Sequence, residues 1–564
     1  MFEFTLNPGF VPILAGLIVL AAPRIARAPI MALAALAALW LVLGNEFGAA
    51  ATMRQMGVET VPLDLDALNR IFGIVMLILL IAIAIYTGAR RNRYEDAAIL
   101  MLAGGAVSAL FVGDLVFLVA AVALSGLAAA WIVFASPLDG ARFAGVRLLI
   151  WHGLEGLLFL IGVALHLTAT AGISKFVRLD AGSISGACIF AALLLRIGAP
   201  FAHVWLKDVV SHASAAGGAA LTAFSTMLGV YALARLFPAE PLLAPIGGAM
   251  IVVGLVFAVI TDDLRRAAAY ALTAQTGVCV ALIGEGSRLS LAAAEGHAFA
   301  ALLGFAALQM VLGALLERGG VRRLSEMKGV ARAMPITSFL HLAAALACSA
   351  VPGFALYATQ TVALDAMARW ELRWLWLLVA LTSAVLFVVL ALRPTLEAHR
   401  ATAPRPFRES PFPMMLGASL ATFLCFSIGV APQWLYALMP TELAFQPYEI
   451  ERLAPQLALI GAAGVAYLAS RGVGLAPAAL PSRTLDVDAF YRGPVAGAGR
   501  WAGVLLLRAY GAWQAGAARA GYGAMRMFDR LSQLWDRPFA PARSAAAAQF
   551  LAIGAFLLLM LLFR

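Results

Sequence analysis

The sequence predicts an all-α polytopic membrane protein with about sixteen transmembrane helices. Composition, the spacing of apolar runs and the placement of basic residues lead to this prediction. Of the 564 residues, 63% are hydrophobic and 12% are charged, whereas a soluble domain averages about 45–50% apolar and about 25% charged residues. A chain this apolar cannot hide its surface from water, so we expect lipid to be its solvent.

The apolar runs are long enough to cross a membrane. A spanning helix needs roughly 20 mostly apolar residues. The first run follows no basic stretch and no small-residue cleavage site, so we expect it to remain as a helix. The predicted spans are 8–23, 28–44, 71–89, 95–112, 114–135, 146–170, 184–200, 216–236, 241–260, 266–285, 290–316, 335–358, 372–393, 411–437, 455–470 and 546–563.

The basic loops named below all follow odd-numbered runs. Short loops rich in Lys and Arg stay in the cytoplasm, so one orientation satisfies every basic loop. This orientation places both termini on the extracytoplasmic side of a cell (inner) membrane. Basic cytoplasmic loops also explain the net charge of +10, so the charge does not require a nucleic-acid partner. The residues are Arg24, Arg27, Arg90, Arg91, Arg93, Arg265, Arg266, Arg318, Arg322, Arg323, Lys328, Arg332, Arg393, Arg400, Arg405 and Arg408, and a longer basic segment follows the fifteenth run.

Proline interrupts two of the predicted helices. Pro200 lies in a GAPF segment of the seventh run, and Pro352 lies in an AVPG segment of the twelfth. Proline removes a backbone hydrogen bond and breaks a helix. Broken helices five apart predict two inverted five-helix repeats, runs four to eight and nine to thirteen, and paired breaks often mark an ion site. A packing kink is the alternative for either proline alone.

These features divide the chain into six parts. We expect three N-terminal helices over 1–93, a first repeat over 94–236 and a second repeat over 241–393. Two further helices follow over 411–470, then an interfacial segment over 484–545 and a last transmembrane helix over 546–564.

The interfacial segment is predicted to form an amphipathic helix over 500–537. Five arginines fall within about 40° of one another on a helix of 3.6 residues per turn, and aromatic residues occupy another face. We expect this lateral helix to lie on the cytoplasmic interface against lipid headgroups, with docking to a partner protein as the alternative. The glycines Gly511, Gly516, Gly521 and Gly523 weaken it and could break it. The arginines are Arg508, Arg519, Arg526, Arg530 and Arg537.

Ionisable residues inside spanning helices are candidates for function, because a charge in lipid costs several kcal/mol. In the sixth run, His152, Glu155 and His166 share one face within roughly 60°. His titrates near neutral pH, and a desolvated Glu can approach that range. The trio could relay protons, or it could be a set of interhelical hydrogen bonds.

Other polar residues have simpler interpretations beside the functional one. His297 and His341 are single histidines on apolar helices, where packing is the simpler interpretation. His203, Lys207, Asp208 and His212 follow the break at Pro200; they could gate proton entry or cap a helix end. The last group, which we expect to form a solvated loop, is Asp262, Asp263, Arg265 and Arg266.

Four segments carry a family resemblance, in chain order and on the predicted helices. They are PFAHVWLKD at 200–208, DLRR at 263–266 with the AY, Gln275 and Gly277 that follow, GHAF at 296–299 and VPGF at 351–354. They resemble motifs of a family of antiporter-like proton-channel subunits. Members of this family occur in respiratory complex I and, as the A-type and D-type components, in Mrp-type multisubunit Na⁺/H⁺ antiporters. The match covers about 110–360, and the lateral helix before the last span is also similar to the largest such complex I component.

The resemblance implies a lateral proton route through buried Lys and Glu side chains, and this chain lacks them. Arg196 lies one residue from the seventh-helix position, and it can set a field but cannot release a proton. The positions that match the relay hold Ala123, Leu195, Met227, Ala301 and Thr359.

Three functions remain open from the sequence. The first is a membrane subunit of a proton- or cation-translocating complex, bound to other membrane subunits, with a lost or rerouted proton path. The second is a structural membrane subunit without transport, and the third is a stand-alone secondary transporter. We expect no cofactor, no metal and no catalytic chemistry in this chain itself, because it has no dinucleotide fingerprint or haem motif and its cysteines are widely spaced. They are Cys188, Cys279, Cys348 and Cys425.

Overall fold

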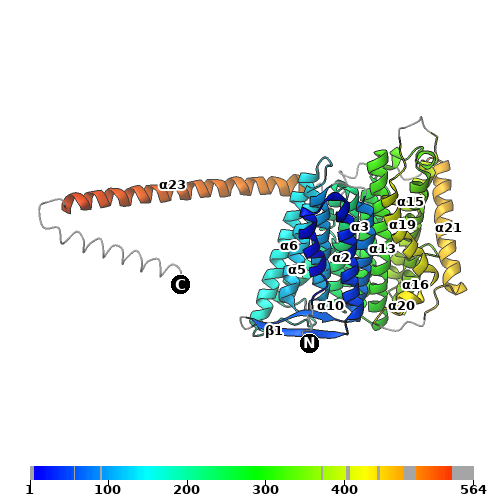
Figure 1. Ribbon diagram of the computed structural model, residues 1–564, viewed down its shortest axis with the longest axis horizontal. Coiled ribbons are helices and arrows are strands. Elements are labelled where there is room, and N and C mark those ends of the chain that lie inside the picture. Colours follow the sequence, from blue (N-terminus) through cyan, green and yellow to red (C-terminus); the bar gives the residue numbers. More distant parts are fainter. Residues whose placement is uncertain are drawn as a thin grey trace. The chain divides into compact units, whose positions relative to one another are not determined.

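The protein is a bundle of membrane-length helices (Figure 1). The computed structural model describes residues 6–55, 58–88, 92–369, 372–401, 407–440, 445–475 and 491–535. The chain divides into two compact units, Met1–Leu485 and Asp486–Arg564.

The first unit begins with ten helices and one strand pair. The helices up to residue 236 are α1 (Phe10–Ala21), α2 (Arg24–Gly44), α3 (Ala67–Thr87), α4 (Arg93–Phe111), α5 (Leu115–Phe134), α6 (Ala141–Ala169), α7 (Ile184–Ile197), α8 (Val204–His212), α9 (Ala215–Phe224) and α10 (Thr226–Leu236). The helices after it are α11 (Leu243–Ile260), α12 (Leu264–Glu285), α13 (Arg288–Gly319), η1 (Leu324–Glu326), α14 (Val330–Ala333), α15 (Pro335–Ala347), α16 (Ala355–Arg369), α17 (Arg373–Leu386), the π-helix η2 (Phe387–Leu392), α18 (Arg393–Ala398), α19 (Phe412–Val430), α20 (Gln433–Tyr436) and α21 (Ile450–Gly472).

Twelve helices of the described residues are long and apolar enough to cross a membrane, against about sixteen predicted. Three of the other predicted runs form shorter apolar helices, α1, α7 and α15. Both α7 and α15 are short because each ends at an interruption of its run. The last predicted run, 546–563, lies outside the described residues.

Helix α13 forms the centre of the first unit. It packs against α3, α9, α12, α15, α16 and α19, and every residue from Ala292 to Leu315 is buried. A helix that is apolar and buried all round lies inside a protein, not at its lipid surface. Polar side chains on α13 therefore face other parts of the chain.

The all-α prediction misses a strand pair. Strands β1 (Gly48–Gln55) and β2 (Val58–Leu65) form an antiparallel hairpin between α2 and α3. In β2, the buried residues Val61, Leu63 and Leu65 alternate with the less buried Pro62 and Asp64, which is typical of a half-buried strand. The signal is short and lies between two long apolar runs. The hairpin and the N-terminus lie at the same end of the first unit (Figure 1).

Asp114 joins this hairpin to the bundle. It caps the N-terminus of α5 by accepting hydrogen bonds from Val116 N at 2.8 Å and Phe117 N at 2.9 Å. Its second oxygen accepts from Val61 N in β2 at 2.8 Å. The side chain is fully buried, so these three N–H groups depend on it.

Both predicted proline breaks coincide with gaps in helix. At the first, α7 ends at Ile197 and α8 begins at Val204, and Gly198 and Phe201 have positive φ. At the second, α15 ends at Ala347 and α16 begins at Ala355. Inside a bilayer each freed backbone group needs a partner from the protein. Gln456 Nε2 supplies one by donating to the Ala350 carbonyl at 3.0 Å.

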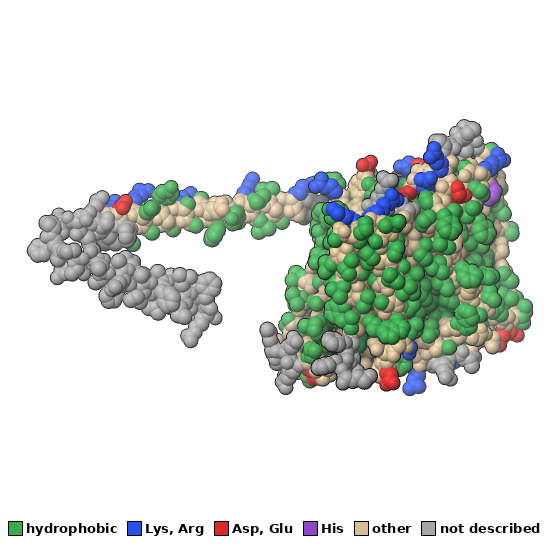
Figure 2. Space-filling view, viewed as in Figure 1, with side chains coloured by type: hydrophobic (Ala, Val, Ile, Leu, Met, Phe, Trp, Pro, Cys, Tyr) green, Lys and Arg blue, Asp and Glu red, His purple; other side chains and the backbone are tan. Residues whose placement is uncertain are grey.

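Basic side chains gather at the end of the first unit opposite the hairpin (Figure 2). A chain of ion pairs lies among them. Asp208 contacts Arg147 and Arg266, and Asp263 contacts Arg266 and Arg322. We refer to this end as the basic end and to the other as the hairpin end.

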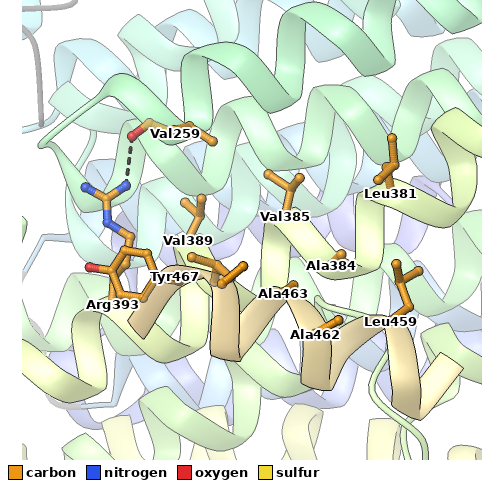
Figure 3. Close-up of a pocket in the computed structure, with 12 residues that line it drawn as sticks. Val259, Leu381, Ala384, Val385, Val389, Arg393, Leu459, Ala462, Ala463 and Tyr467 are labelled. Carbon is orange, nitrogen blue, oxygen red and sulfur yellow. Dashed lines mark hydrogen bonds between the residues drawn. The ribbon is translucent and has the colours of Figure 1, made fainter. Parts of the chain in front are cut away.

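An apolar cavity of about 440 Å³ lies between η2, α17 and α21 (Figure 3). At one end Arg393 Nη1 donates to the Val259 carbonyl at 2.8 Å, next to Tyr467. The other lining residues are aliphatic, among them Leu381, Val385 and Leu459. This cavity offers no carboxylate or histidine to a proton.

The second unit contains η3 (Tyr491–Val495) and α23 (Ala496–Trp535). Helix α23 runs for 40 residues without interruption through all four glycines that the sequence marks as weak points. At 1.5 Å per residue it is about 60 Å long. Of the five arginines on its predicted face, Arg537 lies outside the described residues.

Replacing Asp114 should destabilise the hairpin end. Asp114→Ala removes a helix cap and leaves a buried N–H of β2 without a partner, which together cost about 1–3 kcal/mol. The measurement is thermal unfolding of the purified protein in one detergent. Exposed Asp139→Ala is the control and should change the unfolding free energy by less than about 0.5 kcal/mol. Equal effects of the two variants would contradict the role of Asp114.

Candidate functional site

A buried carboxylate lies where α6 passes the end of α7. Glu155 comes from the middle of α6 and is 1% exposed. Its Oε1 accepts a hydrogen bond from Arg196 Nε at 2.7 Å, and its Oε2 lies 2.6 Å from His152 Nδ1. We call His152, Glu155 and Arg196 the α6–α7 cluster.

Arg196 is held by two elements besides its own. It lies in the last turn of α7, just before the interruption, and is 1% exposed. Its Nη2 donates to the Val122 carbonyl of α5 at 3.1 Å. The guanidinium therefore joins α5, α6 and α7, and its charge is balanced by Glu155 at direct contact.

His152 forms the other side of the cluster. Its ring lies against Trp205 of α8, with 5.3 Å between ring centroids. Its Nε2 is buried and has no hydrogen-bond partner among the described residues. Because an arginine does not release its proton in proteins, a proton that enters this cluster can rest only on His152 or Glu155.

The predicted trio is therefore only partly assembled. His152 and Glu155 are in contact, but His166 lies eleven residues beyond Glu155, about 16 Å along the helix at 1.5 Å per residue. Its Nε2 is buried without a hydrogen-bond partner in the described part of the chain. Sharing a helix face does not bring side chains together when several turns separate them.

The four residues predicted after Pro200 are on or beside α8, and the structure spreads them over two environments. His203 and Lys207 pack on the ring of Tyr270 from α12. The ring centroids of His203 and Tyr270 are 6.1 Å apart, and Lys207 Nζ lies 5.6 Å from the Tyr270 centroid. Asp208 joins the ion pairs of the basic end, and the ring of His212 bonds to the Asp208 carbonyl at 2.7 Å. All four are mostly buried, as α8 packs against α6, α9 and α12.

A second polar group lies in the centre of the bundle. His297 of α13 is fully buried, with Nε2 2.9 Å from Gln275 Oε1 of α12 and Nδ1 3.3 Å from Thr359 Oγ1 of α16. This group joins three helices without a formal charge from a carboxylate or a lysine. His341 is buried on α15, and no described hydrogen bond involves its ring.

The positions that match the family relay differ in environment. Ala123 is exposed and Leu195 is partly exposed, whereas their neighbours Val122 and Arg196 face inward. Met227 and Ala301 are buried and apolar, and Thr359 bonds to His297. The inward-facing charge on α7 therefore lies one residue after the counted position.

Arg265 is buried, so the expectation that it belongs to a solvated loop is wrong. It is 2% exposed, and its guanidinium donates to the Ala213 carbonyl at 2.6 Å and the Ser214 carbonyl at 2.9 Å. These carbonyls lie between α8 and α9, where the chain needs hydrogen-bond donors. Asp262 instead accepts from Ser325, as the expectation of a polar surface loop requires.

Glu295 is one of several buried ionisable residues that the sequence argument passed over, together with Glu95 and Asp96 of α4. Glu295 is 5% exposed on α13 and lines a cavity at the hairpin end. The signal was available, since a single acid occurs early in the long apolar run 290–316. The nearby GHAF motif drew attention to His297 instead.

Comparison with known proteins gives one matching family. A model of the family described as "NADH:quinone oxidoreductase/Mrp antiporter, TM" matches residues 72–386. NADH-quinone oxidoreductase subunit N from Desulforudis audaxviator is 28% identical over 57% of this chain and 68% of its own length. The A/B component of a probable K⁺/H⁺ antiporter from Rhizobium meliloti is 26% identical over 34% of this chain, which spans only 22% of that relative.

Solved structures show the same fold. A chain of the Mrp complex from a Dietzia species has a TM-score of 0.69 at 18% identity and covers 81% of this chain and 100% of its own length. A chain of the archaeal membrane-bound sulfane sulfur reductase has a TM-score of 0.69 at 18% identity over 98% of this chain and 99% of its own. A chain of respiratory complex I from Thermus thermophilus has a TM-score of 0.67 at 18% identity, over 81% and 99% of the two chains.

Arg196 should stabilise the fold mainly by neutralising Glu155. Arg196→Gln leaves a buried carboxylate without its cation and should lower the free energy of unfolding by about 3–5 kcal/mol. The double variant Glu155→Gln/Arg196→Gln removes both charges and should recover much of the lost unfolding free energy. Thermal unfolding in detergent measures both. The exposed pair Arg369–Asp365 supplies the control, because Arg369→Gln should cost only about 0–1 kcal/mol. A double variant no more stable than Arg196→Gln would mean that the two residues are not coupled.

Proposed function

This chain belongs to the NADH:quinone oxidoreductase/Mrp antiporter membrane family, and from that premise we propose that it is one member of a multisubunit complex that moves protons or cations across the cell (inner) membrane. The observation that carries the proposal is the α6–α7 cluster. The chains of similar fold in solved structures belong to multisubunit membrane complexes. We therefore propose that its partners are other membrane subunits.

The proposed proton path is rerouted. The cluster keeps a buried acid next to a buried cation beside the interruption of α7, but the acid comes from α6 and the cation is an arginine. Arg196 balances the charge of Glu155 and cannot itself release a proton. The transfer steps then fall to His152 and Glu155, with His203 and Lys207 on the side of the basic end.

The proposed topology keeps sixteen spans in two inverted repeats. Predicted runs four to eight (94–236) and nine to thirteen (241–393) form the repeats, between 1–93 and the two helices of 411–470. The gaps in helix near Pro200 and Pro352 support this division. The gathering of basic residues at one end supports a cytoplasmic basic end and extracytoplasmic termini.

The proposed position of the 484–545 segment is the cytoplasmic membrane surface, ahead of the last span in 546–564. Helix α23 is continuous, and its described side chains are exposed within its own unit. Anionic headgroups attract such arginines by roughly 1 kcal/mol each. The alternative occupant of the arginine face is an acidic surface of another protein of the complex.

A structural role without transport is the second candidate. The observation that favours it is the apolar character of Ala123, Met227 and Ala301, which cannot carry a proton. In that case the α6–α7 cluster would serve only to hold three helices together.

Removing the Glu155 charge should abolish the proton flux that this chain carries. Glu155→Gln keeps the shape but cannot titrate, and because it leaves the Arg196 charge uncompensated, the flux is also measured in the charge-balanced double variant Glu155→Gln/Arg196→Gln. The measurement is pH-gradient formation by the complex, purified through a tag on this chain and reconstituted in vesicles. His152→Ala should also lower the flux, by about 10²-fold or more if its ring transfers the proton.

His166→Ala is the matched control for this test, because His166 is a buried histidine of the same helix that does not contact Glu155. Exposed Glu451→Gln controls for a change of charge. Unchanged flux in both Glu155→Gln and His152→Ala would overturn the rerouted path. An unmodified complex whose flux does not depend on this chain would favour the structural role.

The lateral helix should be accessible from the cytoplasm only. In a variant without the four native cysteines, Arg519→Cys and Arg526→Cys should react with a membrane-impermeant thiol reagent added from the cytoplasmic side. Asp180→Cys, in the exposed loop between α6 and α7 at the hairpin end, should react only from the other side. The opposite result at either site would reverse the proposed topology.

A further inference from the structure

A polar cavity of about 620 Å³ opens at the hairpin end of the first unit. Its outer lining includes Asp66, which follows β2, and the exposed residues Arg288 and Pro440. Leu291 and Ala292 of α13 form one wall. The innermost charged residue is Glu295, on the same helix.

Glu295 reaches well into the bundle. It lies seven residues after Arg288, about 10 Å along α13 at 1.5 Å per residue, and it is 5% exposed. Its Oε2 is buried and has no hydrogen-bond partner among the described residues. A buried carboxylate without a partner is rare and usually marks function or a bound water, and this one lines a cavity.

The neighbouring charges are already committed to one another. Asp66 accepts a hydrogen bond from Asn69 N at 2.9 Å and forms an ion pair with Arg235. The Arg235 guanidinium lies over the ring of Tyr231, 5.8 Å from its centroid. Asp66 and Arg235 therefore neutralise each other, whereas no described ion pair neutralises Glu295.

The inner side of Glu295 adjoins the central polar group. Gly296 is so close to α16 and Met439 that a Cβ there would lie 3.5 Å from Thr359 Cγ2 and would collide with Met439 Cε. Thr359 bonds to His297, and Pro440, next to Met439, lines the cavity. Gly296, the residue after Glu295, thus lies beside both Met439 and Thr359, and Thr359 belongs to the group of Gln275, His297 and Thr359.

We propose that Glu295 is a proton-exchange site at the hairpin-side mouth of this chain, where it takes up or releases a proton between the water of the cavity and the central polar group. The proposal rests on the proposed function in proton translocation. In each exchange the Glu295 O–H bond breaks as water gains the proton, or forms as water gives it up, so no other reactant is needed.

The chemistry of the cavity favours a proton over a metal cation. A hard metal ion needs several converging oxygen ligands, and both Asp66 oxygens are already bound. Among the described residues, no group of three or more His, Cys, Asp or Glu could hold a metal ion. A single carboxylate facing water suits the binding of one proton.

Chemical modification tests the site without relying on transport. Dicyclohexylcarbodiimide, an apolar reagent, attaches to protonated carboxyl groups that are shielded from bulk water. In native membranes that contain the whole complex, peptide mass spectrometry should find it on Glu295, less at alkaline than at acidic pH, and not in Glu295→Gln. Glu155 should be modified less than Glu295, because both of its oxygens are bonded, to Arg196 and to His152. An unmodified Glu295 peptide at every pH would overturn the proposal.

Flux measurements separate this proposal from the broader function. In the reconstituted complex, Glu295→Gln should lower the proton flux by about 10²-fold or more, and Glu295→Asp should restore part of it. The control, Glu240→Gln, removes an acid from a loop at the same end and should not change the flux. Flux that falls in Glu155→Gln but not in Glu295→Gln would overturn the role of Glu295 and leave the proposed function intact.

Flux unchanged in both the Glu155 and Glu295 variants would overturn the two proposals together. Replacing Na⁺ by K⁺ in the assay distinguishes the ion, since proton exchange at Glu295 predicts the same Glu295→Gln effect in either salt. An effect confined to Na⁺ would overturn the proton assignment.

Discussion

The need to satisfy every backbone polar group inside a bilayer shapes this protein more than any other constraint. Two helices are interrupted within the membrane, and side chains supply the missing partners. Trp205 donates to the Leu195 carbonyl at 3.1 Å, Arg265 donates to two carbonyls between α8 and α9, and Gln456 donates to Ala350. Arg196 also bonds to a backbone carbonyl, that of Val122 in the uninterrupted helix α5, and this bond helps to place its Nε against Glu155. The candidate site thus lies directly before the interruption of α7.

An arginine at this place changes what the site can do. A lysine in the same position could lose its proton and take part in transfer, whereas arginine remains charged and offers a planar fork of donors. Here the fork joins the carboxylate and a backbone carbonyl at once. Glu155 consequently lies beside a cation that cannot discharge, and His152 is its other direct neighbour. A proton that enters the cluster is therefore shared between Glu155 and His152.

The sequence predicted most of the long apolar runs and the two interruptions, because hydropathy and proline act locally, and basic side chains gather at one end of the first unit. It did not predict the hairpin, whose alternation over β2 is brief, or the burial of Arg265, which depends on carbonyls about fifty residues away. The site was found in part. His152 and Glu155 are one helical turn apart, so their contact followed from spacing, whereas the partnership with Arg196 required the packing of α6 on α7. His166 shares their helix face, but angular position alone does not show the rise of about 16 Å along the helix that separates it from Glu155.

The two halves of the bundle contain different buried polar groups. The first half retains a charged pair, whereas the second half has the uncharged group of His297, Gln275 and Thr359, with Glu295 at its outer edge. In both places buried polar atoms remain without partners among the described residues, namely His152 Nε2, Gln275 Nε2 and Glu295 Oε2. Buried groups of this kind are normally satisfied by ordered water. Water held by fixed histidines and carboxylates can conduct protons with fewer titrating side chains, so the missing lysines do not by themselves close the path. Apolar side chains such as Met439, which packs beside Gly296, border these polar groups.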